Sequence, residues 1–205
     1  MRELSKWRPK PLLPVAGHPL IAWSIRALQH ANIKRVGVNT FHLGAQLREA
    51  LNQYEQPQLI ITEEQELQGT GGGVRELLSA LDQGREAPTP GLLVLNGDAW
   101  FDFELNALTR EHLAEPAREA TLALRLTTPD DPFGRVGLDA QGRVVRVAEL
   151  KGPRAHEEVS VAAFLGAQMV GRAVLDVIPE GPCDLFRGAL KERLEAGALI
   201  GAHLV

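Results

Sequence analysis

The sequence predicts an α/β protein in which helices flank a mostly parallel sheet. Between residues 20 and 115, segments with helical periodicity alternate with short apolar segments, and this alternation is typical of right-handed βαβ units. Residues 92–95 are apolar at every position, as expected of a strand that is buried on both faces of a parallel sheet. A chain of 205 residues is long enough for one domain with a substantial core.

Four helices are predicted in the first part of the chain, because apolar residues recur there three or four positions apart. Pro19 suits the start of the first helix, since proline lacks the N–H that the first helical position leaves unbonded. Strands are predicted at residues 35–39, 59–61 and 92–95, and a surface loop rich in glycine and proline at 83–91. The apolar helix positions are Ile21, Ile25 and Leu28; Leu43, Leu47 and Leu51; Val74, Leu77, Leu78 and Leu81; and Leu105, Leu108 and Leu113.

After residue 118 the pattern changes to one dominated by strands. These are predicted at residues 120–127, 135–138, 143–149 and 159–169. The second and third form an antiparallel hairpin, because the turn between them can close on Gly142 in a positive-φ conformation. Asp184 is a good N-cap for a last helix that carries Leu185, Phe186, Leu190 and Leu194. No linker is long enough to split the chain, so we expect residues 1–205 to form a single domain.

The composition excludes several classes of protein. The net charge of −4 provides no broad basic field for nucleic acid or an anionic membrane. The single cysteine, Cys183, excludes an internal disulfide and a cysteine-rich zinc site, which favours a reducing, cytoplasmic location. No segment approaches 18 consecutive apolar residues, and no apolar run follows the basic residues near Met1, so we expect neither a membrane span nor a signal peptide.

A stiff basic segment precedes the first helix. Pro9, Pro11 and Pro14 restrict the backbone on both sides of Lys10. Such a segment can hold one lysine at a fixed point in a site. The alternative is a structural arm whose lysine is solvated, as single lysines usually are.

A glycine-rich segment, residues 68–73, lies between the strand at 59–61 and the next helix. Glycines allow backbone N–H groups to approach a ligand closely, and a helix N-terminus favours anions. The segment lacks the Gly-Lys-Ser/Thr of a P-loop and does not open a first βα unit as a dinucleotide fingerprint would. It predicts either a ligand-binding loop or a plain flexible turn.

A third candidate is the sequence Asn96-Gly97-Asp98, which follows the most apolar predicted strand. Ligands of open α/β sheets bind beyond the carboxyl ends of the strands. A carboxylate there can hold a hard cation such as Mg²⁺. The alternative is that Asp98 caps the following turn.

In this order and at these distances, the three segments resemble the sugar-1-phosphate nucleotidyltransferases, also called nucleotide-sugar pyrophosphorylases. Residues 8–17 resemble the PKPLLPVAG block of that family, residues 67–73 its nucleobase loop, and residues 96–98 its strand-end Gly-Asp. Looser similarity at 149–153, 164–166 and 184–186 extends the match over nearly the whole chain. The resemblance implies a Rossmann-like fold, with a mostly parallel sheet flanked by helices and an antiparallel extension on the sugar side.

The resemblance also implies a role for each matching residue. Lys10 would contact the phosphates and Asp98 would hold Mg²⁺, and these two are the expected catalytic residues. The expected nucleotide-binding residues are Gly69, Thr70, Gly71, Gly72 and Asn96, and the expected sugar-phosphate-binding residues are Glu149, Lys151 and Gly166. The family places its lysine directly after the glutamate, whereas Leu150 intervenes here.

Two segments of the family pattern are absent from the sequence: the glycine loop that wraps the triphosphate, which would precede Met1, and a second metal aspartate, which would follow Val205. We expect either a fragment of an active enzyme or a natural short form, and we expect residues 1–205 alone to be nearly inactive.

The implied reaction joins an NTP to a sugar 1-phosphate and yields an NDP-sugar and pyrophosphate. The implied partners are therefore these two small molecules, with Mg²⁺ as cofactor, no nucleic acid and no membrane; homo-oligomerisation is left open. One alternative is a regulatory relative that binds nucleotide or sugar nucleotide without catalysis. Another is a glycosyltransferase of similar architecture, although residues 98–100 do not form the Asp-x-Asp metal pair usual there.

Overall fold

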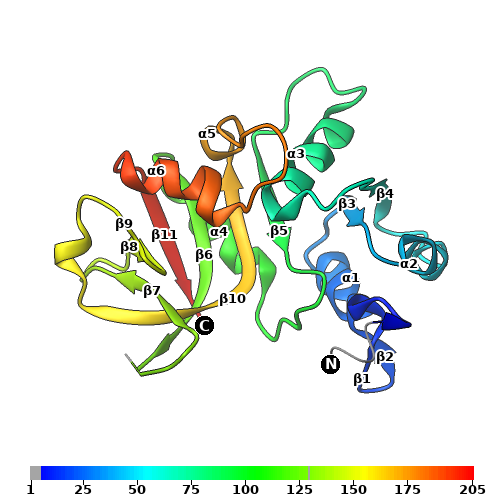
Figure 1. Ribbon diagram of the computed structural model, residues 1–205, viewed down its shortest axis with the longest axis horizontal. Coiled ribbons are helices and arrows are strands. Elements are labelled where there is room, and N and C mark those ends of the chain that lie inside the picture. The colour runs from blue at the N-terminus through cyan, green and yellow to red at the C-terminus, as the bar shows by residue number, and fades with distance from the viewer. Residues whose placement is uncertain (1–5, 129) are drawn as a thin grey trace.

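The structure is a computed structural model that describes residues 6–128 and 130–205. Strands and helices alternate through the first half, as β3 (Arg35–Thr40), α2 (Gly44–Leu51), β4 (Gln58–Glu63), α3 (Gly69–Asp82) and β5 (Gly91–Leu95). They are preceded by a 3-10 turn, η2 (Lys10–Leu12), the short strands β1 (Pro14–Val15) and β2 (His18–Pro19), and helix α1 (Leu20–His30). Figure 1 shows this half on one side of the molecule.

The second half builds most of a seven-stranded sheet. Its central strand is the long β10 (Ser160–Gly171), which pairs antiparallel with β5, with β6 (Arg118–Thr127) and with β7 (Gly134–Leu138). Beyond β6 lies β11 (Leu199–Leu204), in parallel register. Beyond β7 lie β8 (Val144–Val147) and β9 (Leu150–Lys151), both antiparallel. The strands β3 and β4 form a separate parallel pair.

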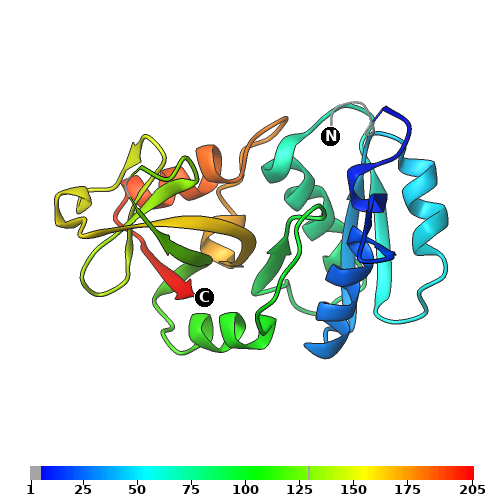
Figure 2. The ribbon, with the colours of Figure 1, turned by 90° about the horizontal axis from the view of Figure 1, so that it is seen from below.

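Helices cover both faces of the large sheet. On one face, α4 (Leu105–Leu113) packs its buried Leu105 and Leu108 with Leu28 of α1 and with Ala123 and Met169 of the sheet. On the other face the cover comes from α3, α5 (Arg172–Leu175), the π-helical turn η4 (Phe186–Leu190) and α6 (Lys191–Glu195). Figure 2, seen from below, shows α4 beneath the sheet. A third cluster joins Leu12, α1 and α2 beside β3 and β4.

Most predicted elements are present. Helix α1 buries Ile21, Ile25 and Leu28 as its periodicity predicts. The predicted hairpin is β7–β8, where Gly142 has a φ of +74° and donates its N–H to Asp139 O at 3.0 Å. The α/β class and the flanking helices are confirmed. No helix among the described residues is long and apolar enough to cross a membrane.

Three local expectations are corrected. Among the described residues, only β3–β4 and β6–β11 pair in parallel, whereas β10 pairs antiparallel with β5, β6 and β7, so the sheet is not mostly parallel. Strand β5 is half-buried along its length, although its apolar sequence predicted full burial. Among the described residues it pairs with β10 on one side and not with a strand on each side. Leu113 ends α4 on its outer side and is 69% exposed, although its spacing predicted a core position.

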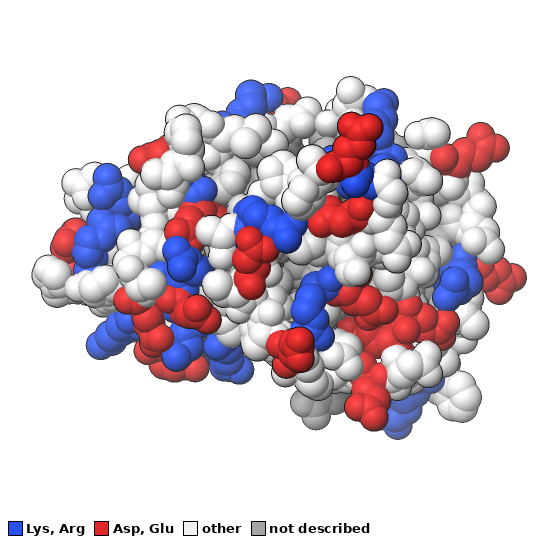
Figure 3. Space-filling model, turned by 90° about the horizontal axis from the view of Figure 1, so that it is seen from above, with Lys and Arg blue, Asp and Glu red and all other residues white. Residues whose placement is uncertain are grey.

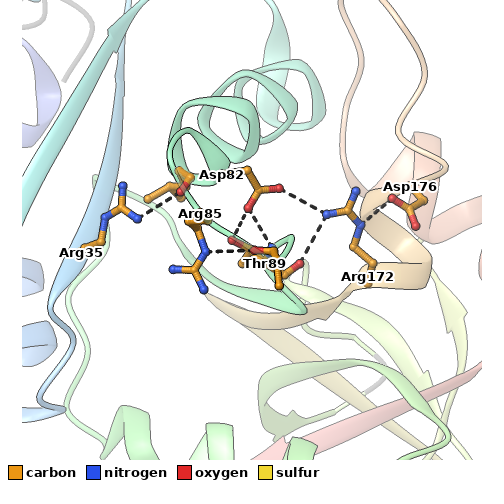
Figure 4. Close-up of polar contacts among 8 residues, drawn as sticks. Arg35, Asp82, Arg85, Thr89, Arg172 and Asp176 are labelled. Carbon is orange, nitrogen blue, oxygen red and sulfur yellow. Dashed lines mark hydrogen bonds and ion pairs between the residues drawn. The ribbon is translucent and has the colours of Figure 1, made fainter.

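The loop after α3 is tied to α5 by a polar network (Figure 4). The Asp82 carboxylate accepts hydrogen bonds from the N–H and hydroxyl of Thr89 and from Arg172, which also donates to Asp176. The Thr89 hydroxyl is the first cause, and the Thr89 N–H the second, that hold the pKa of Asp82 below its usual 3.8. This network lies at the end of α3 opposite to the glycine-rich segment.

A pH-dependent contribution to stability follows from the lowered pKa of Asp82. A carboxylate whose pKa is lower in the folded state stabilises that state above its unfolded pKa, and this contribution is lost as the pH falls through the folded value. We therefore expect Asp82→Asn to lower the melting temperature at neutral pH. The gap between variant and parent should narrow in thermal melts recorded from about pH 7 down to about pH 3. A gap of constant size over that range would contradict the assignment.

Candidate functional site

The N-terminal arm brings Lys10 to the end of β5. Leu12 is buried against α1 and α2 and anchors the arm. Pro9 precedes η2, and Leu13 donates its N–H to Lys10 O at 3.0 Å, which closes the turn. In this position the Lys10 ammonium lies 3.8 Å from the Asp98 carboxylate. Both side chains are about half exposed, at 57% and 48%, so the pair is open to a ligand.

The loop after β5 holds Asp98 beside the arm. Ala99 donates its N–H to Asn96 O at 3.2 Å, and the Ser24 hydroxyl of α1 donates to Ala99 O at 3.5 Å. A Cβ placed on Gly97 would lie 3.8 Å from the ring of Pro11. The N-cap of the following helix α4 is Glu104. Asp98 therefore lies within the turn at residues 96–99, and its carboxylate faces Lys10.

Gly166 reaches the same loop from β10. It has a φ of +84° and accepts a hydrogen bond from Asn96 N at 2.8 Å. The pairing of β10 with β6 shifts register between Phe164 and Gln168, so that the strand bulges where Gly166 lies. A Cβ on Gly166 would lie 3.1 Å from the side-chain nitrogen Nδ2 of Asn96. The structure thus brings together Lys10, Asp98, Asn96 and Gly166 from three distant parts of the sequence.

The glycine-rich segment is the first part of α3 rather than a loop before it, which corrects the expected boundary. Gly71 and Gly72 donate their N–H groups to the carbonyl of Cys183, at 2.9 and 3.4 Å. A Cβ on Gly69 would lie 2.5 Å from that carbonyl oxygen. The glycines therefore provide the space in which the backbone at Cys183 approaches the helix, and the helix N-terminus is already capped by a carbonyl.

Contacts along residues 183–187 connect this helix start with Glu149. The Thr70 hydroxyl accepts a hydrogen bond from Leu185 N at 2.9 Å and donates to the Asp184 carboxylate at 3.4 Å. The other oxygen of Asp184 accepts from Arg187 N at 2.9 Å, as the predicted N-cap requires. The Arg187 guanidinium then pairs with Glu149 at 3.6 Å.

Lys151 lies apart from these contacts. It is exposed on β9, opposite Arg146 of β8. Arg146 forms a bidentate pair with Glu158, and the hydrogen bond from Arg146 is the main reason why the pKa of Glu158 is lowered; the charge of Lys151 is the smallest contribution. Arg187, not Lys151, is the cation that the structure shows beside Glu149.

A cavity of about 480 Å³ lies between the arm and the end of β3. Its walls are formed by Lys6, Pro9, Lys10, Pro11, Asn39, Thr40, Phe41, His42 and Leu47. Lys10 thus borders both this cavity and Asp98. On the face that Figure 3 shows, basic side chains form no broad area, whereas acidic side chains gather over its lower right part.

Sequence reasoning missed Arg187, the carbonyl of Cys183, and the pair of Asn39 and Glu64 near the start of α3. Asp184 was assigned a capping role only. The available signal for Glu64 is weak: it is one of three acidic residues, with Glu63 and Glu66, between the predicted strand and the glycines. The role of the Cys183 carbonyl could not be predicted from residue type, because every residue has a backbone carbonyl.

We expect Gly69→Ala to destabilise the fold more than Gly84→Ala. Both glycines have a positive φ, +71° and +73°, so both substitutions strain the backbone. Only at Gly69 does the added Cβ collide with another segment, since nothing lies within 4 Å of the position at Gly84. Displacing the Cys183 carbonyl should cost about 1–3 kcal/mol beyond the control, the cost of leaving buried donors unpaired. Equal free energies of unfolding in denaturant titrations would contradict this role.

Comparisons with known proteins show the family to which the chain belongs. The sequence model of the family described as "Nucleotidyl transferase" matches residues 1–166. The chain is 31% identical over 191 residues to the bifunctional protein GlmU of Burkholderia ambifaria, and 36% identical over 152 residues to that of Paraburkholderia phymatum. The alignments cover 92% and 73% of this chain but only 38% and 31% of those proteins, so the chain matches about a third of their length.

Solved structures show the same fold at low sequence identity. HddC from Yersinia pseudotuberculosis superposes with a TM-score of 0.74 at 16% identity, over 96% of this chain and 81% of that one. The inositol-1-phosphate CTP transferase from T. maritima superposes with a TM-score of 0.73 at 13% identity, over 100% and 80%. The expected nucleotide-diphospho-sugar transferase fold is thereby confirmed.

Proposed function

We propose, from the premise that the chain belongs to the nucleotidyl transferase family, that it supplies the site for joining an NTP to a sugar 1-phosphate. The products would be an NDP-sugar and pyrophosphate. An oxygen of the sugar phosphate attacks the α-phosphorus of the NTP, a P–O bond forms, and the bond from that phosphorus to pyrophosphate breaks. Proton transfer is not needed, because the attacking phosphate is already anionic near neutral pH.

One observation carries the proposal: Lys10 and Asp98, 88 positions apart by their numbering, lie 3.8 Å apart at the end of β5. The pair is exposed and contributes little to stability, which leaves both charges available to a ligand. Gly166 is buried against the same loop, where its lack of a side chain allows residues 96–99 to pack closely on β10.

The donor chemistry of Asp98 fits Mg²⁺. Its carboxylate is a hard oxygen ligand, and 48% of the side chain is exposed. Mg²⁺ is commonly held by one or two carboxylates together with substrate phosphates. Within residues 6–128 and 130–205, no three His, Cys, Asp or Glu side chains are grouped as a metal site. When bound, it would neutralise charge on the nucleotide phosphates.

The remaining work of the site is positioning and charge neutralisation. Phosphoryl-type transfer requires little covalent participation by the protein, and alignment of the attacking and leaving oxygens accounts for much of the rate. Lys10 would place a compact positive charge on the phosphates. The helix start at Gly69–Gly72 would border the nucleobase, and Glu149 with Arg187 would face the sugar side.

A panel assay tests the proposal. The full-length gene product is mixed with each of the four common NTPs and a set of hexose 1-phosphates, and pyrophosphate is measured. We expect release that requires NTP, sugar phosphate and Mg²⁺ together. Nucleotide binding without pyrophosphate release from any pair would instead support the regulatory alternative. The panel also identifies the base and the sugar.

A further inference from the structure

We propose that Glu64 is a positioning residue: its carboxylate, together with the amide of Asn39, fixes the place and direction of the start of α3. The inference rests on the proposed function in one respect, that residues 69–72 border the nucleotide. Glu64 would act on nucleotide binding through the backbone that it holds, without touching the nucleotide itself.

Glu64 is a buried carboxylate with two dedicated donors. It follows β4, is 9% exposed, and its N–H extends the β3–β4 pairing by donating to Thr40 O at 2.8 Å. The oxygen Oε1 accepts from the Asn39 amide at 2.7 Å, and Oε2 accepts from Gln68 N at 2.9 Å. A buried carboxylate without such donors would be costly, so its two bonds define where Asn39 and Gln68 lie.

Gln68 is the residue directly before α3, and its peptide groups are held from both sides. Its N–H donates to Glu64, and its carbonyl accepts from Cys183 N at 2.8 Å. Gly69, next in sequence, has the positive φ with which the chain turns into the helix. Glu64 and Cys183 therefore fix the backbone from which Gly69–Gly72 project.

Gly73 provides the space for this pair. A Cβ at that position would overlap the Asn39 amide nitrogen and would lie 3.1 Å from Glu64 Oε1. Gly73, the fifth residue of α3, must therefore lack a side chain for Asn39 and Glu64 to be in contact. Asn39 also lines the cavity beside Lys10, so the pair lies between that cavity and the helix start.

Exchanging the two side-chain types provides a test. Glu64→Gln removes the charge and leaves one oxygen for two donors, so Asn39 and Gln68 N no longer share a carboxylate acceptor. Asn39→Asp places two carboxylates against each other. In the double variant the introduced amide can donate to the introduced carboxylate, while its own oxygen still accepts from Gln68. Glu63→Gln is the matched control, because the neighbouring Glu63 pairs with Arg48 at the exposed surface.

Hydrogen exchange of the ligand-free protein measures how firmly the start of α3 is held, independently of nucleotide binding. We expect each single variant to raise exchange of the amides at residues 65–73 by about tenfold or more, with β6 and β10 unchanged, and the double variant to restore protection. The Glu63→Gln control should match the parent. Unchanged exchange in Glu64→Gln, or a double variant worse than either single one, would overturn the inference.

Nucleotide binding then connects the role to function. With the parent's preferred NTP, we expect Glu64→Gln to raise Kd about tenfold while Kd for the sugar phosphate stays within about twofold, which corresponds to loss of one hydrogen-bonded contact. The double variant should recover most of the affinity. Equal weakening for both substrates would contradict a local positioning role. A parent that binds no NTP would refute the proposed function, whereas the exchange result decides the role of Glu64 independently.

Discussion

Replacing Asp98 by asparagine should lower the Mg²⁺-dependent kcat of the full-length gene product by about a thousandfold or more. A loss of this size is expected because the variant loses both the metal and one preorganised electrostatic contact. Asparagine keeps the size and an oxygen of the side chain but removes the negative charge that attracts the cation. The measurement is kcat as a function of Mg²⁺ concentration.

Stability is the control for this variant. The pair with Lys10 is half exposed, and exposed ion pairs contribute only about 0–1 kcal/mol. The free energy of unfolding should therefore change by less than about 1 kcal/mol. A large loss of stability with Mg²⁺ dependence intact would mean that Asp98 is a structural residue of the loop.

Replacing Lys10 by alanine should lower kcat/KM about 100-fold or more, the usual result of removing one preorganised charge from a phosphate site. Its backbone lies in η2, which Leu12 anchors in the core, so the effect is expected in turnover and not in folding. Lys10→Arg should restore only part of the rate, since a planar guanidinium is longer and differently shaped. Lys191→Ala is the matched control, because Lys191 is a partly exposed lysine of α6 that pairs with Glu195 of its own helix.

A kcat/KM of Lys10→Ala within about threefold of the parent would mean that Lys10 is a solvated lysine without a role in turnover. The phosphate would then have to meet another cation, and Arg187 beside Glu149 would be the next to test.

The elements that the sequence predicted best are those set by local periodicity. Helix α1 and strand β3 have their apolar residues at regular spacing, so their type and approximate ends follow from the pattern. The positions of Lys10 and Asp98 in one site came from the order of three motifs, and the structure confirms that the two residues are close.

The features that could not be predicted depend on contacts between distant residues. An apolar run such as β5 does not show which strand will lie beside it, and its pairing with β10 is antiparallel. The glycines at 69–73 suggested a loop because glycine usually weakens helices. Thr70 and Leu185, 115 residues apart, belong to the contacts that make this stretch helical. The pairing of Glu149 with Arg187 likewise joins distant residues and has no local signal.

The most direct test of the central claim is a ³¹P NMR experiment on the full-length gene product with the NTP and sugar 1-phosphate that it binds, and Mg²⁺. The account predicts that the three NTP resonances and the sugar phosphate resonance decrease together. Two coupled resonances of a sugar diphosphate ester and the single resonance of pyrophosphate should replace them, and none of these should appear with Asp98→Asn. Unchanged spectra under conditions in which both substrates are bound would contradict the account and identify a binding protein without transfer activity.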